Sequence, residues 1–101
     1  MNEKNQRFAR YKRELLAIIH NYLPDCKVYL FGSRARKTHQ SGSDVDLALD
    51  CGASINFDII VKIHNDIEKT TIPLTVDLVD LYGASETLKK EVKEEGIAWE
   101  N

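Results

Sequence analysis

The stretch from residue 27 to residue 50 limits most strictly what this chain of 101 residues can fold into. A short apolar run at 28–31 stops at Gly32, and after a polar spacer the acidic pair Asp44 and Asp46 opens a second apolar run. The first run is rich in β-branched and aromatic residues, which predicts a buried strand at about 28–31. Glycine at its end allows a sharp turn, or the close approach of another group to the backbone. The stretch therefore predicts two strands with polar groups gathered where they connect.

The residues that follow the first strand predict a phosphate-binding site. Ser33 is a favourable N-cap, and residues 34–37, Arg-Ala-Arg-Lys, favour a short helix. The first N–H groups of a helix have no acceptor within it, and together with a serine hydroxyl they bind phosphate readily. Gly32 and Ser33 are therefore the candidate phosphate ligands. Arg34 and Arg36 lie within a turn of them, so either at least one of the two reaches a phosphate or both are ordinary surface charges.

The second strand is predicted to begin at Asp44 and to end near residue 50. Side chains alternate along a strand, so its residues divide between two faces. One face holds Asp44, Asp46 and Ala48, and the other, the core face, holds Val45, Leu47 and Leu49. Two carboxylates on one face repel each other unless a cation lies between them. Oxygen ligands of this kind suit Mg²⁺ and also Mn²⁺, so the two aspartates are candidate metal ligands.

Three amphipathic helices and two further strands complete the predicted fold. Apolar residues recur at helical spacing over 5–22, 54–69 and 86–95. Residues 74–81 form an apolar run typical of a third strand, and 97–99 alternate like a short closing strand. This succession predicts an α+β fold in which helices pack on a mixed sheet, and the length predicts one domain over residues 1–101.

Asp77 interrupts the apolar run of the third predicted strand. A carboxylate buried there would be strongly unfavourable unless it were paired or bound to a metal ion. The simplest explanation is that Asp77 faces the same site as Asp44 and Asp46. Asp80 is the competing candidate, but it points to the opposite face near the end of the strand, where capping the next turn is an ordinary role. Asp77 is therefore predicted to be the third carboxylate of the site.

Composition argues against several classes of function. The formal net charge is -2 and the pI about 5.9, so no overall basic field attracts nucleic acid, and strong direct nucleic-acid binding is not expected. No apolar run approaches the roughly 18 residues of a membrane span, and residues 1–14 lack the apolar core of a signal peptide. These features predict a cytoplasmic protein without membrane contact, in which Cys26 and Cys51 are free thiols.

Taken together, these residues resemble a known family. Phe-Gly-Ser at 31–33, a spacer, and Asp-Val-Asp-Leu at 44–47 closely resemble the signature of the nucleotidyltransferase superfamily of DNA polymerase β type. Gly-Ser-Arg-Ala-Arg at 32–36 is similar to the minimal nucleotidyltransferases (MNT proteins) of bacterial and archaeal MNT–HEPN toxin–antitoxin pairs. Lys37 departs from the pattern, because many relatives carry glycine there. The resemblance extends over nearly the whole chain and implies the minimal nucleotidyltransferase core.

The resemblance also implies an activity. Asp44, Asp46 and Asp77 would be the catalytic residues and would hold two Mg²⁺ ions, or Mn²⁺ in their place, because the family supplies a third acidic residue from the strand that Asp77 occupies. ATP would be the substrate. The acceptor would be a hydroxyl on a partner protein, a tyrosine of a HEPN-domain RNase toxin, and the transfer of AMP would silence that toxin. The chain would then act as an antitoxin in a hetero-oligomer.

Two other functions stay open at this stage. The chain could neutralise such a partner by binding alone, as a non-catalytic antitoxin, although all three carboxylates are present. It could instead be one subunit of a small-molecule nucleotidyltransferase that resembles the aminoglycoside-modifying enzymes. In that case a second domain or subunit would have to hold the acceptor.

Overall fold

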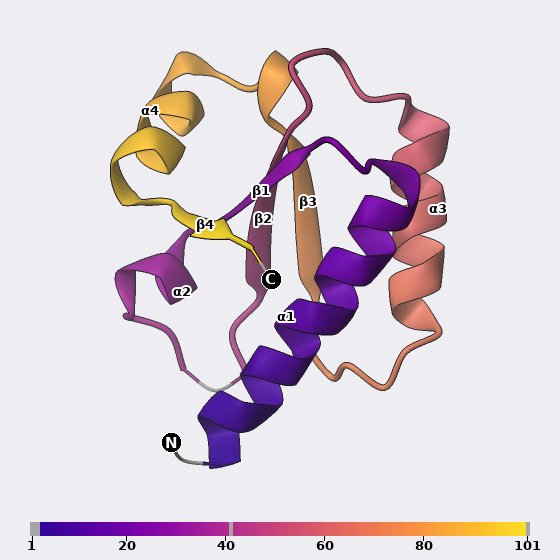
Figure 1. Ribbon diagram of the computed structural model, residues 1–101. Helices are drawn as coiled ribbons and strands as arrows, with labels where there is room; N and C mark the ends of the chain where they lie inside the picture. The colour runs from indigo at the N-terminus through magenta and orange to yellow at the C-terminus, as the bar shows by residue number, and fades with distance from the viewer. Residues whose placement is uncertain (1–2, 41, 101) are drawn as a thin grey trace.

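The computed structural model describes residues 3–40 and 42–100 and shows helices on both faces of one sheet (Figure 1). The elements follow in the order α1 (Glu3–Tyr22), β1 (Lys27–Phe31), α2 (Ser33–Arg36), β2 (Val45–Asp50), α3 (Phe57–Glu68), β3 (Val76–Asp80), the 3-10 turn η1 (Leu81–Gly83), α4 (Glu86–Glu95) and β4 (Ile97–Trp99).

The strands form a mixed sheet in the order β3-β2-β1-β4. β1 lies antiparallel to both β2 and β4, whereas β2 and β3 are parallel and are joined by the crossover helix α3. The C-terminal end of β1 therefore lies beside the N-terminal ends of β2 and β3. This arrangement confirms the predicted α+β fold, and it places the residues after β1 next to those that begin β2.

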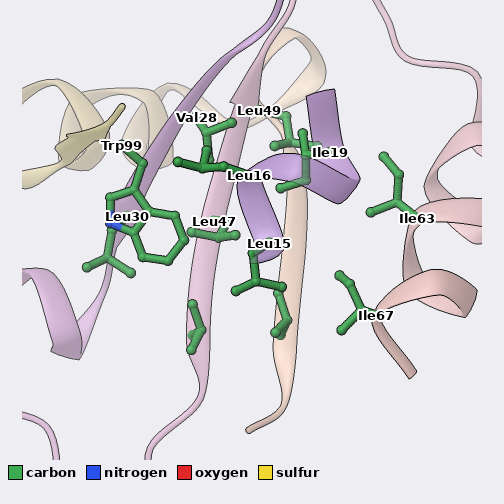
Figure 2. Close-up of a cluster of buried hydrophobic side chains, with 12 residues drawn as sticks. Leu15, Leu16, Ile19, Val28, Leu30, Leu47, Leu49, Ile63, Ile67 and Trp99 are labelled. Atoms are coloured by element: carbon green, nitrogen blue, oxygen red, sulfur yellow. The ribbon is translucent and has the colours of Figure 1, made fainter. Parts of the chain in front are cut away.

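α1 and α3 cover one face of the sheet and enclose the main hydrophobic core (Figure 2). Leu15, Leu16 and Ile19 of α1 are fully buried, as is Ile63 of α3. They pack on the face of the sheet that was predicted to be the core face of the second strand. Full burial of a Leu or Ile side chain is worth about 1.5–3 kcal/mol, so this layer fixes the position of the sheet against α1 and α3. The sheet residues of this core are Val28, Leu30, Val45, Leu47, Leu49 and Val76, with Trp99 at the edge.

α4 covers part of the opposite face. Its Val92 packs with Phe31 and Ala48 in a second, smaller cluster over β1 and β2. Ser85 caps the helix by accepting a hydrogen bond from the Leu88 N–H, and the helix ends before Gly96 as predicted. This second face is the one that carries Asp46 of β2, because Asp46 and Ala48 are two residues apart on one strand.

Several element boundaries differ from the predicted ones by a few residues. β2 begins at Val45, so Asp44 precedes the strand instead of opening it. α3 begins at Phe57, not near residue 54, because the Asn56 side chain caps it by accepting a hydrogen bond from the Asp58 N–H at 2.8 Å. β3 is shorter than predicted, and the short strand β4 lies where it was predicted.

Cys26 and Cys51 are joined by a disulfide, which corrects the expectation of free thiols. Lys27 pairs with Asp50 across β1 and β2, so the cysteines occupy the next positions along the two strands, and their Cα atoms are 4.3 Å apart. The pairing of the strands brings the sulfurs together, which the spacing in the sequence does not reveal. The bond closes the end of the β1–β2 pair that lies opposite Gly32.

Over the residues described, no helix combines the length and the apolar character needed to cross a membrane.

Candidate functional site

The three predicted carboxylates lie at one end of the sheet. Asp46 of β2 is paired in register with Phe31 of β1 on one side and with Asp77 of β3 on the other. Since β2 and β3 are parallel and in register, Asp46 and Asp77 project from the same face. Asp44 lies just before β2, close enough for its charge to act on Asp46. The structure therefore brings together Asp44, Asp46 and Asp77 as the sequence predicted.

Asp46 is the carboxyl group with the most unfavourable surroundings in this site. Its side chain is partly buried, and burial raises the pKa of Asp46 above its ordinary value. The charge of Asp77 and a hydrogen bond with its carboxyl group raise the pKa further, and the charges of Asp44 and Glu91 add to the effect. The negative charges of four acidic groups are thus close enough to repel one another. A bound cation would relieve the repulsion among them.

Asp77 is exposed, so the expectation that its carboxylate is buried in the third strand was wrong. Burial does not disfavour its carboxylate, and the desolvated group of the pair is Asp46. Asp80 has the structural role that was expected. Its carboxylate caps η1 by accepting a hydrogen bond from the Tyr82 N–H at 3.1 Å, and it also accepts one from the Ile55 N–H at 2.9 Å.

Gly32 lies against the Asp46 carboxylate. Its backbone adopts φ 76°, a left-handed conformation that other residues rarely adopt. A Cβ atom built at this position would lie 2.5 Å from Oδ2 of Asp46. Glycine is thus required twice here, by the turn at the end of β1 and by the close approach of the carboxylate.

The predicted phosphate-binding turn is shorter than expected. α2 spans only Ser33–Arg36, and its N-cap is Gly32, so the prediction that Ser33 caps the helix was wrong by one residue. The cap position requires the positive φ that glycine adopts without cost, and Ser33 becomes the first helical residue. Lys37 ends the helix with φ 61°, the conformation that glycine would favour at this position.

Arg34 points into the protein. It is 8% exposed, and its Nε and Nη2 atoms donate hydrogen bonds to the Ser43 carbonyl oxygen at 3.1 and 2.9 Å. Its guanidinium lies over the Phe8 ring, 4.7 Å from the centroid. Burial lowers the pKa of Arg34, but a guanidinium stays charged in proteins. These contacts give no support to the prediction that Arg34 binds a phosphate.

Arg36 points to the surface, toward α4. Its Nη1 lies 3.4 Å from a carboxylate oxygen of Glu91 and 3.4 Å from one of Glu95. Glu91 also acts on Asp46, so Arg36 lies at the rim of the acidic site. Glu91 was not predicted from the sequence, because it belongs to a helix far along the chain and its spacing from Glu95 is that of any solvated helix face.

The acidic groups supply part of the ligand shell of a metal ion, and a substrate and water would complete it. Within the described ranges, no three acidic, histidine or cysteine side chains converge closely enough to form a complete metal site by themselves. Mg²⁺ is usually held by one or two carboxylates and by the phosphates of a substrate, with water completing the shell. Asp46 and Asp77, with Asp44 beside them, fit that pattern, because their mutual repulsion favours a cation at this place.

A fold with this site defines a class of protein: the chain belongs to the family described as "Polymerase beta, Nucleotidyltransferase", whose profile matches residues 14–98. It is accordingly a nucleotidyltransferase. Among curated proteins it is similar to the "Probable protein adenylyltransferase MntA" of Haemophilus influenzae, with 30% identity over 86 residues that cover 81% of this chain and 75% of that protein. The predicted resemblance to the minimal nucleotidyltransferases is thereby confirmed.

Solved structures support the fold assignment. A toxin–antitoxin complex with AMP-PNP contains a chain with 24% identity and a TM-score of 0.68, and the match covers 89% of this chain and 73% of that one. A tri-AMPylated HEPN toxin in complex with MNT antitoxin from Shewanella oneidensis also gives a TM-score of 0.68, at 22% identity over 89% of this chain and 69% of the other. At these identities the likeness shows the shared fold.

Proposed function

We propose that this chain transfers AMP from ATP to a hydroxyl group of a partner protein, a tyrosine of a HEPN-domain toxin, and that it acts as the antitoxin of that partner. The single observation that carries the proposal is the pair Asp46 and Asp77, which are adjacent in register beside Gly32 in a chain of this family. The name of the Haemophilus relative supports transfer to a protein, and the neighbouring complexes support the partner and the nucleotide.

The proposed reaction is an in-line displacement at the α-phosphate of ATP. The acceptor oxygen forms a bond to phosphorus while the bond to the bridging oxygen breaks, and pyrophosphate leaves. Mg²⁺ bound by the aspartates would neutralise the triphosphate and lower the pKa of the attacking hydroxyl. The Asp77 carboxylate, which is exposed and forms a hydrogen bond with Asp46, would accept the hydroxyl proton.

The remaining candidate residues bind and orient the triphosphate. Gly32 and Ser33 offer N–H groups at the first turn of α2, and Ser33 adds its hydroxyl. Only Nη1 of Arg36 is used by Glu91 and Glu95, which leaves the other donors of its guanidinium for a phosphate. Phosphoryl transfer depends mainly on such positioning and on charge neutralisation, so few residues suffice.

The test is an incubation of the purified chain with ATP labelled at the α-phosphate, with Mg²⁺, and with or without the protein encoded beside it. Label on that protein, dependent on metal and lost in Asp44→Ala/Asp46→Ala, is the expected result. Asp58→Asn is the matched control, because it removes an exposed carboxylate from α3 on the other face of the sheet.

Two results would contradict the proposal. A tight complex that survives the double substitution, without any label, would identify a non-catalytic antitoxin that acts by binding. Label on a small hydroxyl compound, but not on the protein, would identify a subunit of a small-molecule nucleotidyltransferase. Mass spectrometry of the labelled peptide would decide whether the acceptor is a tyrosine.

A further inference from the structure

We propose that Arg34 is a positioning residue that holds Asp44 in place for metal binding, and that the Phe8 ring of α1 supports the Arg34 guanidinium. The inference rests on the proposed function, because Asp44 is one of its candidate metal ligands. It gives α1 a part in the site, although the sequence predicted no site residue in this helix. Phe8 also lies before residue 14, where the family match begins.

The first observation is the direction of the Arg34 side chain. Two of its nitrogens donate to a single acceptor, the Ser43 carbonyl oxygen, and Ser43 directly precedes Asp44. A forked donor on one carbonyl restricts both the distance and the direction of that peptide group. Because the side chain is buried, water does not compete for these donors as it would at the surface.

The second observation is that Asp44 is fixed from its other side as well. The N–H of Val45 donates a hydrogen bond of 2.9 Å to the carbonyl oxygen of Thr75, which lies two residues before Asp77. The peptide groups before and after Asp44 are thus both tied, one to α2 and one to the segment that enters β3. An exposed aspartate outside the strand would otherwise be free to move, and these bonds set the position of its Cα atom.

The third observation is the support beneath the guanidinium. The Phe8 ring lies under Arg34, and the Trp99 ring meets Phe8 edge to face with centroids 6.0 Å apart. The cation–π contact holds the guanidinium plane where its fork reaches Ser43. The column from Trp99 through Phe8 to Arg34 therefore links β4 and α1 to Asp44.

The two arginines of the motif thus have different tasks. Arg34 points inward and fixes the backbone before a metal ligand, while Arg36 points outward to the rim. Partners of metal ligands in other proteins typically change metal affinity by about 10–100-fold when they are replaced. Arg34→Lys keeps the charge but replaces the fork by a single ammonium group, so it should weaken metal binding through Asp44 by about 10-fold or more.

The experiment measures Mn²⁺ binding to the purified chain by electron paramagnetic resonance, with the Mg²⁺ dependence of AMP transfer as a second readout. Arg34→Lys is compared with wild type, with Asp44→Asn and with the double variant. Arg13→Lys, an exposed arginine on the outer face of α1, is the matched control and should bind Mn²⁺ like wild type. Phe8→Leu keeps the guanidinium of Arg34 but removes the ring beneath it, and should give a smaller loss of affinity.

The expected result is weaker Mn²⁺ binding by Arg34→Lys, and no further loss when the substitution is added to Asp44→Asn. Wild-type affinity in a folded Arg34→Lys chain would overturn the inference and leave the proposed function intact. An equal loss in the Asp44→Asn background would overturn it too, because Arg34 would then act on the fold in general. If Arg34→Lys does not fold, wild-type Mn²⁺ affinity in Phe8→Leu overturns it. Absence of both Mn²⁺ binding and AMP transfer in wild type would overturn the proposed function itself.

Discussion

Asp46 lies beside the Gly32 backbone and the Asp77 carboxyl group, on the face of the sheet that α4 covers in part. The sequence allowed either a sharp turn or a close approach at Gly32, and the structure has both. It did not predict that Ser33 would follow the cap position, since a serine N-cap and a glycine N-cap leave the same pattern. Glu91 could not be found at all, because nothing local relates α4 to β2.

Gly32→Ala should remove most of the activity, because its methyl group would displace the Asp46 carboxylate. A shift of about 1 Å in a reacting group can lower the rate about 100-fold. Gly52→Ala is the matched control: Gly52 has φ 72°, but a Cβ atom there would meet nothing within 4 Å. Both positions have a positive φ, so each variant should lose about 1–3 kcal/mol in urea unfolding. The AMP-transfer assay should nevertheless find Gly52→Ala fully active. Equal activity in the two variants would contradict this account of Gly32.

Asp46 should make the metal-free protein less stable as the pH rises. The folded state raises the pKa of Asp46 above the ordinary 3.8, so its favourable contribution is complete below that value and is lost as the pH rises through the folded-state pKa. In EDTA at neutral pH, Asp46→Asn should therefore unfold at a higher temperature than wild type, and the difference should shrink in acid. Mg²⁺ should raise the unfolding temperature of wild type but not that of Asp46→Asn. Asp58→Asn is the control, and a wild-type pH dependence in Asp46→Asn would contradict the prediction.

At the scale of the elements, the sequence predicted which segments form helices and strands better than where they begin. α4 was placed correctly because Ser85 and Gly96 mark its ends. The start of α3 was misplaced because Ser54 and Asn56 are both good N-caps, and in the structure it is Asn56 that caps the helix. The disulfide was missed for a related reason, since it depends on strand register, which the cysteine spacing does not contain.

The Cys26–Cys51 bond should stabilise the β1–β2 pair without affecting the chemistry. It closes a loop with a sequence separation of 25, which in the chain-entropy model is worth about 3 kcal/mol. Dithiothreitol should lower the stability of wild type by about that amount, while Cys26→Ser/Cys51→Ser should be indifferent to the reductant. Because the bond lies at the end of the strands away from Asp46, kcat should be unchanged below the unfolding temperature. A fall in kcat on reduction would show that the two ends are coupled.

At the scale of the whole molecule, the two faces of the sheet are covered unequally. α1 and α3 enclose one face, whereas α4 covers the other face over β1 and β2 and leaves Asp77 of β3 exposed. Tyr82, just beyond β3, is 58% exposed. The open part of this face lies over β3, and we expect the acceptor of the proposed reaction to approach there.

Trp99 should be the side chain of β4 on which the whole sheet most depends. It is 5% exposed, it joins the main core, and its backbone pairs with Val28. Trp99→Ala should cost about 3–5 kcal/mol in urea unfolding. Ile97→Ala is the control, because Ile97 is 41% exposed and surface substitutions change stability by about 0.5 kcal/mol or less. Equal effects in the two variants would contradict the role given to Trp99.

The position of β4 beside β1 has a consequence for biosynthesis. The neighbours on either side of β1 are made at very different times: β2 begins at Val45, but β4 begins at Ile97 and is translated only after α3, β3 and α4. Until then one side of β1 presents unpaired N–H and C=O groups, which favour association with other chains. A nascent chain halted before residue 97 should therefore need a chaperone to stay monomeric, because β1 lacks its second neighbour at that stage.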